Sequence, residues 1–340
     1  MDNPIDFVIP WVDGNDPEWR ARKNKYTGDE FTDASQSRYR DWGLLPYWFR
    51  GVEKFAPWVR YIWFICDQEP PTWLNRNHPK LRIVRHEDYL PEGYRPSFSS
   101  HPIELNLHRI RDLSEQFVYF NDDTYLISPV RSDFYFKHGL PRDSAVLEPI
   151  MPDMLKIGYK RPFYICHNNA EYINRDYEFR KCVRKNITKW YSPIYGKGLI
   201  KNIACSLWPK FIGFHEPHMP QPFLKSSFKK AWEQDFDILD QASRHHLRHD
   251  HDVNQWLIRD RQLAEGRFCV RKPLKDALFR IQEDTPLMHQ TIREQRVPMV
   301  CLGDTGETTE EGFVRLKERL LADFDTILKE PSSFEQQIII

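Results

Sequence analysis

The stretch Ile5-Asp6-Phe7-Val8-Ile9-Pro10-Trp11-Val12 lies near the start of the chain, and its residue types favour a β-strand over Phe7–Val12. Three more apolar runs follow, at Tyr61–Cys66, Leu81–Val84 and Phe117–Phe120. Each is short and bounded by polar or Pro-containing sequence, as strands of a sheet are. We therefore predict four strands in the first third of the chain.

Apolar residues at helical spacing lie between these runs. They predict a helix within Asp41–Phe55 and a second one after Ser100, which would place Glu104 and His108 on one helical face. A capping-box pattern at Thr308 and Glu311 predicts an amphipathic helix near the end of the chain. Alternating strands and helices indicate an α/β fold, in which ligands bind beyond the carboxyl ends of the strands.

The composition excludes some classes of protein. The chain has 340 residues, is 40% hydrophobic and contains 11 Trp, so it can bury a large core. It has 49 Lys plus Arg and 49 Asp plus Glu, so no overall charge favours nucleic acid or a membrane. The six cysteines form no C-x-x-C pair, which favours a reducing compartment. We see no secretion signal and no apolar window long enough to span a membrane.

The middle of the chain differs in character. Residues 156–230 hold 15 Lys or Arg and four acidic residues, a local balance of +11, with aromatic residues interleaved. This mixture suits phosphates, sugars, a membrane surface or single-stranded nucleic acid. A solvated basic face is the alternative, and the sequence leaves both open.

Two acidic motifs follow predicted strands. Asp13, Gly14 and Asp16 follow the first strand, where turn formation alone would account for them. Asn121-Asp122-Asp123 follows the fourth strand, and adjacent carboxylates favour a cation partner. Because Mg²⁺ is commonly held by one or two carboxylates plus substrate phosphates, this motif predicts a metal and diphosphate site.

Basic side chains and histidines supply further candidates. His215 and His218 lie in a Pro-rich loop, where either could take a proton from an attacking hydroxyl. In the run from His245 to Asp252 we expect Asp250 or Asp252 to cap a helix rather than bind zinc, and Arg248 to point at a phosphate.

Taken in order, these segments resemble the Stealth family, which includes bacterial capsular polysaccharide phosphotransferases and the catalytic core of the lysosomal-targeting GlcNAc-1-phosphotransferase. The resemblance rests on four blocks that cover most of the chain. The first block is IDFVIPWVDGNDP (5–17). The second is long: it starts at SRYRD (37–41) and includes APWVR (56–60), PTWLN (71–75), SSHPIE (99–104) and NDD (121–123). The third runs from HMP (218–220) to RHDHD (248–252), and the fourth is CLGD (301–304).

The resemblance implies transfer of a hexose 1-phosphate, for example GlcNAc 1-phosphate, from a UDP-sugar to a sugar hydroxyl, with release of UMP. It implies Mg²⁺ or Mn²⁺ at Asp122 and Asp123, and His218 as the base with His215 as the alternative. The other residues that it assigns to catalysis or substrate binding are Glu104, Arg248, Asp13, Gly14, Asp16, Arg38, Asp41, Arg109, Asn121, Lys225, Asp252, Asn254 and Asp304.

We expect a Rossmann-like, glycosyltransferase-A-like mixed sheet with helices on both faces and a basic insertion made mainly of helices and loops. The expected segments are residues 1–150 for the nucleotide sugar, 151–235 facing the acceptor or a membrane, and 236–340 completing the core. Expected partners are a nucleotide-sugar donor, a saccharide acceptor and a peripheral inner-membrane contact in the bacterial cytoplasm, without nucleic acid. A metal-dependent glycosyltransferase and a polyanion-binding module are the alternatives.

Overall fold

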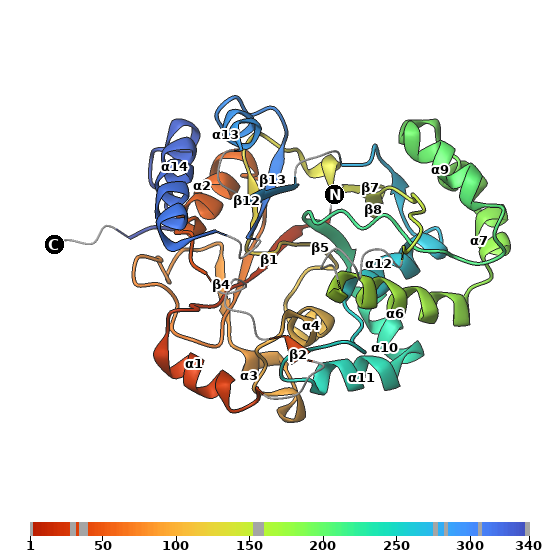
Figure 1. Ribbon diagram of the computed structural model, residues 1–340, viewed down its shortest axis with the longest axis horizontal. Coiled ribbons are helices and arrows are strands. Elements are labelled where there is room, and N and C mark those ends of the chain that lie inside the picture. Colours follow the sequence, from red (N-terminus) through yellow and green to blue (C-terminus); the bar gives the residue numbers. More distant parts are fainter. Residues whose placement is uncertain are drawn as a thin grey trace.

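The structure is a computed structural model that describes residues 3–27, 32–33, 40–151, 160–274, 278–281, 285–304 and 308–336. Its central sheet has the strand order β4-β3-β1-β5-β9 (Figure 1). The first four of these strands are parallel, and β9 runs antiparallel to β5. The bounds are β1 Ile5–Pro10, β3 Ile62–Ile65, β4 Leu81–Val84, β5 Gln116–Tyr119 and β9 Gln221–Leu224. All four predicted strands are therefore present, with ends shifted by at most two residues.

Three smaller sheets complete the β-structure of the described residues. They are β12-β13-β6 (Leu278–Ile281, Met299–Asp304, Thr124–Leu126), β11-β8-β7 (Cys269–Val270, Leu140–Asp143, Phe136–Lys137) and β10-β2 (Arg248–His249, Thr32–Asp33). Strand β6 begins directly after Asp123, and β13 pairs with it in antiparallel fashion. The Leu302 amide donates to the Asp123 carbonyl at 2.8 Å, so a C-terminal strand supports the acidic loop.

Helices cover both faces of the central sheet, as predicted. Phe7 and Ile9 point into one core with α2 (Leu45–Phe55), α13 (Pro286–Arg293) and α14 (Glu310–Leu328). Val8 points into the opposite core, because side chains alternate along a strand. That core includes α4 (Ser100–Leu105), α10 (Lys225–Gln234), α11 (Phe236–Arg244) and α12 (Gln255–Ala264), on the other side of the sheet in Figure 1. The fold is therefore mixed α/β and Rossmann-like.

The remaining helical elements connect or flank these layers. The α-helices are α1 Pro17–Asn24, α3 His86–Tyr89, α6 Lys160–Asp176, α7 Phe179–Lys185, α8 Ile187–Trp190 and α9 Lys197–Cys205. The 3₁₀ turns are Glu92–Tyr94, Leu107–Arg109, Ser132–Phe134 and Pro193–Tyr195. Across the described ranges, none of the helices combines the length and the hydrophobicity needed to cross a bilayer. The division into three segments remains a prediction.

The helix predicted after Ser100 is shorter than the sequence indicated. Helix α4 stops at Leu105 because the Asn106 side chain donates to the Pro102 carbonyl at 2.8 Å, taking the acceptor that a continuing helix would use. Glu104 and His108 therefore do not share a helix.

Two predicted caps also shift along the chain. Thr309 rather than Thr308 caps α14, through a hydrogen bond from the Gly312 amide. Asn254 caps α12 in place of Asp250 or Asp252.

Candidate active site

A cleft of about 320 Å³ lies at the carboxyl ends of the parallel strands. From β1 the chain proceeds outward through β3 and β4, and then returns to the other side of β1 to form β5. The connections after β1 and β5 therefore leave in opposite directions, which opens a crevice between them. Its walls include Trp11 after β1, Asp67 after β3 and the Asn121-Asp122-Asp123 segment after β5.

The chemically reactive part of the cleft is a cluster around Asp123. Asp123 Oδ2 and His218 Nε2 are 3.2 Å apart, and ligand atoms of Asp123, His218 and Cys301 all lie within 4.8 Å of one another. The other carboxylate oxygen of Asp123, Oδ1, is buried and forms no hydrogen bond to a described residue. A buried carboxylate oxygen without a donor suits a cation, so this cluster could hold a metal ion.

The two adjacent acids, Asp122 and Asp123, differ in the direction of their pKa shifts. Desolvation by the surrounding cleft walls raises the pKa of Asp122 to about 7, and the charge of Asp123 adds to the effect. The same desolvation would raise the pKa of Asp123, but the neighbouring His218 outweighs it and lowers that pKa. Asp123 in turn raises the pKa of His218 above its ordinary value. Asp123 is thus the charged acid of the pair, and a bound cation would favour ionisation of Asp122 as well.

Two arginine side chains from other segments of the chain, Arg40 and Arg248, line the cleft. Arg248 lines the cleft and donates from Nη2 to Ser100 Oγ at 3.1 Å. Arg40 lies 3.5 Å from Asp304 Oδ2, which also accepts a hydrogen bond from Trp42 Nε1. Asp41 lines the same wall, and its side chain accepts from the Gly43 amide. The guanidinium groups are suited to bind phosphate oxygens.

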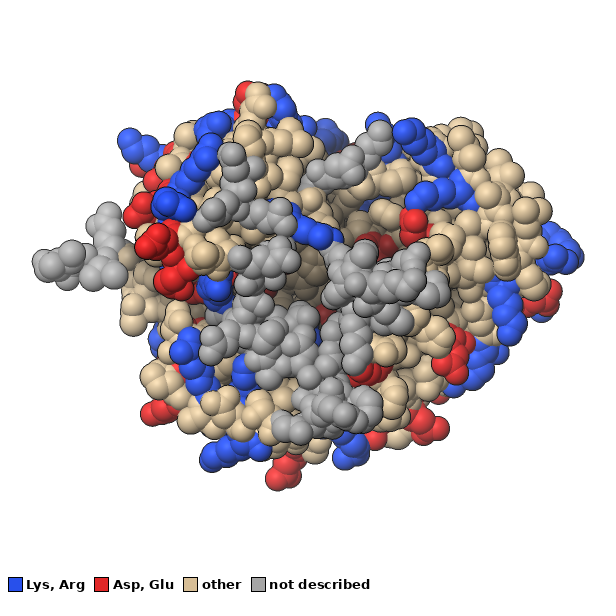
Figure 2. Space-filling view, in the orientation of Figure 1, with Lys and Arg blue, Asp and Glu red and all other residues tan. Residues whose placement is uncertain are grey.

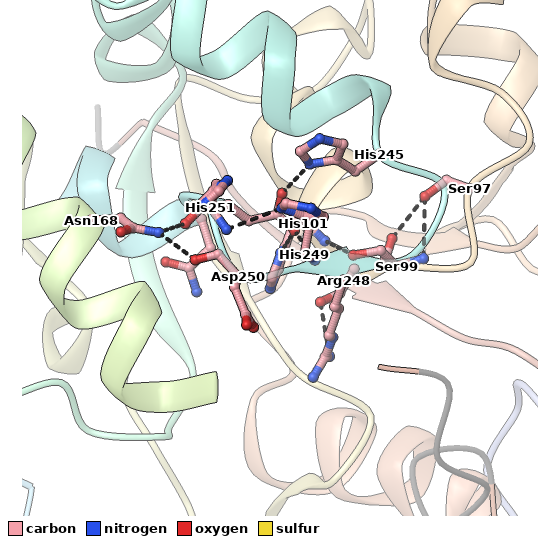
Figure 3. Close-up of polar contacts among 12 residues, drawn as sticks. Ser97, Ser99, His101, Asn168, His245, Arg248, His249, Asp250 and His251 are labelled. Atoms are coloured by element: carbon pink, nitrogen blue, oxygen red, sulfur yellow. Dashed lines mark hydrogen bonds and ion pairs between the residues drawn. The ribbon is translucent and has the colours of Figure 1, made fainter. Parts of the chain in front are cut away.

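The segment that carries Arg248 is held in place by hydrogen bonds to Asp252. Asp252 is fully buried and accepts hydrogen bonds from His101 Nδ1 at 2.7 Å, His245 Nδ1 at 2.5 Å and the His249 amide at 2.8 Å. Burial would raise the pKa of Asp252, but the bonds from His101 and His245 outweigh it and lower the pKa to about 2. In Figure 3 Arg248 points away from these histidines. Asp252 therefore holds the segment that carries Arg248 in place and does not itself line the cleft.

The loop that carries His218 is held by a buried ion pair. Arg259 bonds both oxygens of Asp143, at 2.7 and 2.9 Å, and its Nη1 donates to the His215 carbonyl at 3.1 Å. Asp143 Oδ2 also accepts from Gln221 Nε2 at 2.8 Å. The loop is thus anchored three residues before His218 and three residues after it.

Histidine 215 itself lies outside the cleft lining. Its Nδ1 is buried without a hydrogen-bond partner among the described residues, and burial lowers its pKa. Of the two histidines proposed as the base, His218 is the one that lines the cleft beside the acids.

Several predicted substrate-binding residues perform local structural tasks and do not line the cleft. Asp13 accepts from the Asn15 amide, and the Gly14 carbonyl accepts from Arg20. Asp16 caps α1 through the amides of Glu18 and Trp19. Turn formation, the simpler explanation of this motif, accounts for these contacts.

The same holds for Lys225, Arg109 and Asn254 farther along the chain, and Glu104 also lies outside the cleft lining. Lys225 donates to the carbonyls of Ile110, Arg111 and Leu113. Arg109 packs over the Trp232 ring at 4.8 Å. Asn254 caps α12. Glu104 is 3% exposed behind the cleft wall, where burial raises its pKa. Arg38 lies outside the described residues.

Sequence reasoning missed part of the cleft wall. Trp11, Trp42 and Phe98 supply aromatic surface, Arg40 supplies a cation, and Cys301 lies beside Asp123. The position of Trp11 directly after the first strand was a usable signal for its role. The others come from segments whose proximity is set only by the tertiary fold.

An acid pair, a histidine and an arginine at the switch point of a Rossmann-like sheet define a site suited to transfer chemistry at phosphate. Family models for Stealth protein conserved region 1 and conserved region 2 match residues 3–30 and 38–143. Together with the relatives described next, these matches show that the chain belongs to the Stealth family and is a sugar-phosphate transferase.

Relatives match along nearly the whole chain. A capsular polysaccharide phosphotransferase of Streptococcus pneumoniae is 36% identical over 98% of this chain and 98% of its own length. A receptor polysaccharide phosphotransferase of Streptococcus oralis is 38% identical, over 98% of this chain and 99% of its own. An exopolysaccharide phosphotransferase of Lactiplantibacillus plantarum is 34% identical, over 98% and 96%.

Proposed function

We propose that this enzyme transfers a hexose 1-phosphate from a UDP-sugar to a saccharide hydroxyl in a capsular or cell-surface polysaccharide, and releases UMP. The observation that carries the proposal is the convergence of Asp122, Asp123, His218 and Arg248 on one cleft. Phosphoryl-type transfer depends mainly on positioning and charge stabilisation, and these residue types provide both. The names of the relatives, all polysaccharide phosphotransferases, support the acceptor class.

The donor would occupy the cleft between β1 and β5. Trp11, Trp42 and Phe98 line its walls and offer flat apolar surface to the nucleobase. Arg248 offers its guanidinium to the diphosphate, and its contact with Ser100 holds it in place.

Asp122 and Asp123 are the residues that would hold Mg²⁺ or Mn²⁺. Their oxygens are the donors that these hard cations prefer, and Asp123 Oδ1 has no hydrogen-bond donor of its own among the described residues. Cys301 lies beside Asp123, but Mg²⁺ and Mn²⁺ prefer oxygen ligands to sulfur, so its thiol is a poor ligand for these ions. When bound, the ion would neutralise diphosphate charge and polarise the phosphorus.

His218 would act as the general base. With one imidazole proton on Nε2 and directed at Asp123, the neutral ring keeps a lone pair on Nδ1 for the proton of the acceptor hydroxyl. The hydroxyl oxygen then bonds to the phosphorus next to the sugar, and the bond from that phosphorus to the bridging oxygen breaks. UMP departs, and the anomeric carbon–oxygen bond is retained. Asp123 stabilises the imidazolium that forms.

Product analysis tests the proposal. Purified enzyme with Mg²⁺, UDP-sugars and short capsule-type acceptors should give a new phosphodiester resonance in phosphorus NMR together with UMP. Release of UDP with a phosphorus-free product would instead identify a metal-dependent glycosyltransferase. Asp123→Asn is the control, since it removes the charge and keeps the size of the side chain. If the protein were only a polyanion-binding module, neither product would form and salt-dependent binding would survive Asp123→Asn.

A further inference from the structure

Helix α9 packs one face against the rest of the protein and exposes apolar side chains on the other face. On the inner face, the Asn202 amide donates to the Ala145 and Trp190 carbonyls and accepts from the Leu147 amide at 2.7 Å. On the outer face Ile200 is 69% exposed and Ile203 56% exposed. Just after the helix, Leu207 is 77% and Trp208 53% exposed. We call Ile200, Ile203, Leu207 and Trp208 the α9 patch.

Two features distinguish the patch from scattered surface residues. Ile200 and Ile203 are about one helical turn apart on one side of α9, and Leu207 and Trp208 follow in the exposed segment directly after the helix ends at Cys205. The opposite side is already fixed by Asn202, so the patch cannot turn inward. Contiguous exposed apolar side chains of this kind mark interaction surfaces.

A concentrated positive charge surrounds the patch. Between Phe179 and His215 the sequence has eight Lys or Arg and no Asp or Glu, although the whole chain is neutral. Lys201 pairs with Glu148. Within the part of the chain that the structure describes, six exposed cations of this segment form no salt bridge: Arg180, Lys181, Arg184, Lys185, Lys197 and Lys210. Figure 2 shows an uncharged area over α9 with Lys and Arg on either side.

We propose that the α9 patch and its surrounding cations dock this enzyme on the surface of an anionic lipid bilayer. Apolar side chains and Trp208 would enter the boundary between headgroups and acyl chains, while the cations bind anionic headgroups. Charge complementarity favours this partner over a second copy of the chain, since a self-complementary contact would bring like charges together. A polysaccharide would satisfy the cations but would leave Ile200, Ile203 and Leu207 exposed to water.

Flotation of the full-length protein with lipid vesicles tests the proposal. We expect binding to phosphatidylcholine vesicles that contain phosphatidylglycerol, much weaker binding to pure phosphatidylcholine, and a decrease with added salt. The variant Ile200→Ser/Ile203→Ser/Leu207→Ser should lower partitioning about tenfold or more. Arg184→Gln/Lys185→Gln should lower it by a similar factor, since each headgroup-facing cation contributes roughly a fivefold effect.

The matched control is Leu287→Ser/Val314→Ser, which removes apolar side chains that are 58% and 47% exposed on α13 and α14. It should leave partitioning unchanged, and all these variants should keep wild-type turnover of a short soluble acceptor. Absence of binding to anionic vesicles, or binding that survives the triple substitution, would overturn the proposal. So would a dimer in light scattering that the triple substitution dissociates, or retention on anionic polysaccharide without binding to vesicles.

Discussion

Asp123 Oδ2 lies 3.2 Å from His218 Nε2, although 95 positions separate the two residues in the sequence. One comes from the loop after the central strand β5, and the other from a loop that the buried Arg259 and Asp143 hold in place. The contact joins the acid that would bind the metal to the group that would accept the proton. We therefore expect the activity to depend on Asp123 through metal binding and on His218 through proton transfer.

The first prediction concerns the base. His218→Gln should lower kcat by about 10²–10⁴-fold, because it removes the proton acceptor from the cleft. His215→Gln, three residues earlier in the same loop, should lower kcat by less than tenfold, since its ring lies outside the cleft. Initial rates of UMP release measure both. Equal losses for the two variants would mean that the loop, rather than the His218 imidazole, is what the reaction requires.

The second prediction concerns the metal. A chelator should abolish activity, and Mg²⁺ or Mn²⁺ should restore it, because Asp122 and Asp123 offer oxygen ligands. Cys301→Ser should keep activity within a few-fold with Mg²⁺, since this ion prefers oxygen ligands and does not depend on the thiol. Restoration by Zn²⁺ alone, lost in Cys301→Ser, would show that the thiol is a ligand and that the oxygen-only site is wrong.

The third prediction concerns pH and stability. Asp252 has a folded-state pKa of about 2, below its ordinary value of 3.8, so its contribution is fully present above pH 3.8 and disappears as the pH falls through about 2. Asp252→Asn should therefore lower the free energy of unfolding by roughly 2 kcal/mol at neutral pH and by much less near pH 2. Urea unfolding of both proteins across this range measures the difference. A difference that does not change with pH would contradict the role of the charge.

The fourth prediction concerns the anchor of the His218 loop. Arg259→Met should cost about 3–5 kcal/mol of unfolding free energy, because it leaves Asp143 buried without its partner. Arg259→Met/Asp143→Leu should recover part of that stability, yet kcat should stay low because the His215 carbonyl and Gln221 lose their anchors. Thermal melts and rates measured on the same preparations separate the two effects. Full recovery of kcat in the double variant would exclude a positioning role for the pair.

The sequence predicted the central sheet well because the strands are buried on both faces and read as short apolar runs. It also predicted that Asp122 and Asp123 would lie at the carboxyl edge, since their position follows from the strand before them. Helix α4 was predicted too long. Its end depends on where the Asn106 side chain finds an acceptor, which spacing does not reveal.

The site was predicted less completely than the sheet. Asp16 and Lys225 have the same side-chain chemistry as residues that bind phosphate or metal, yet one caps a helix and the other binds backbone carbonyls. Only tertiary contacts distinguish these uses. The wall formed by Arg40 and Asp304 joins segments from the two ends of the chain, and no local pattern connects them.

The hydrogen bond from the Leu302 amide to the Asp123 carbonyl has a consequence for biosynthesis. The acidic loop leaves the ribosome early, but the strand that supports it is translated about 180 residues later. A nascent chain therefore carries an incomplete active site until β13 emerges and pairs with β6. A chain interrupted before residue 299 should therefore be inactive even if its central sheet has formed.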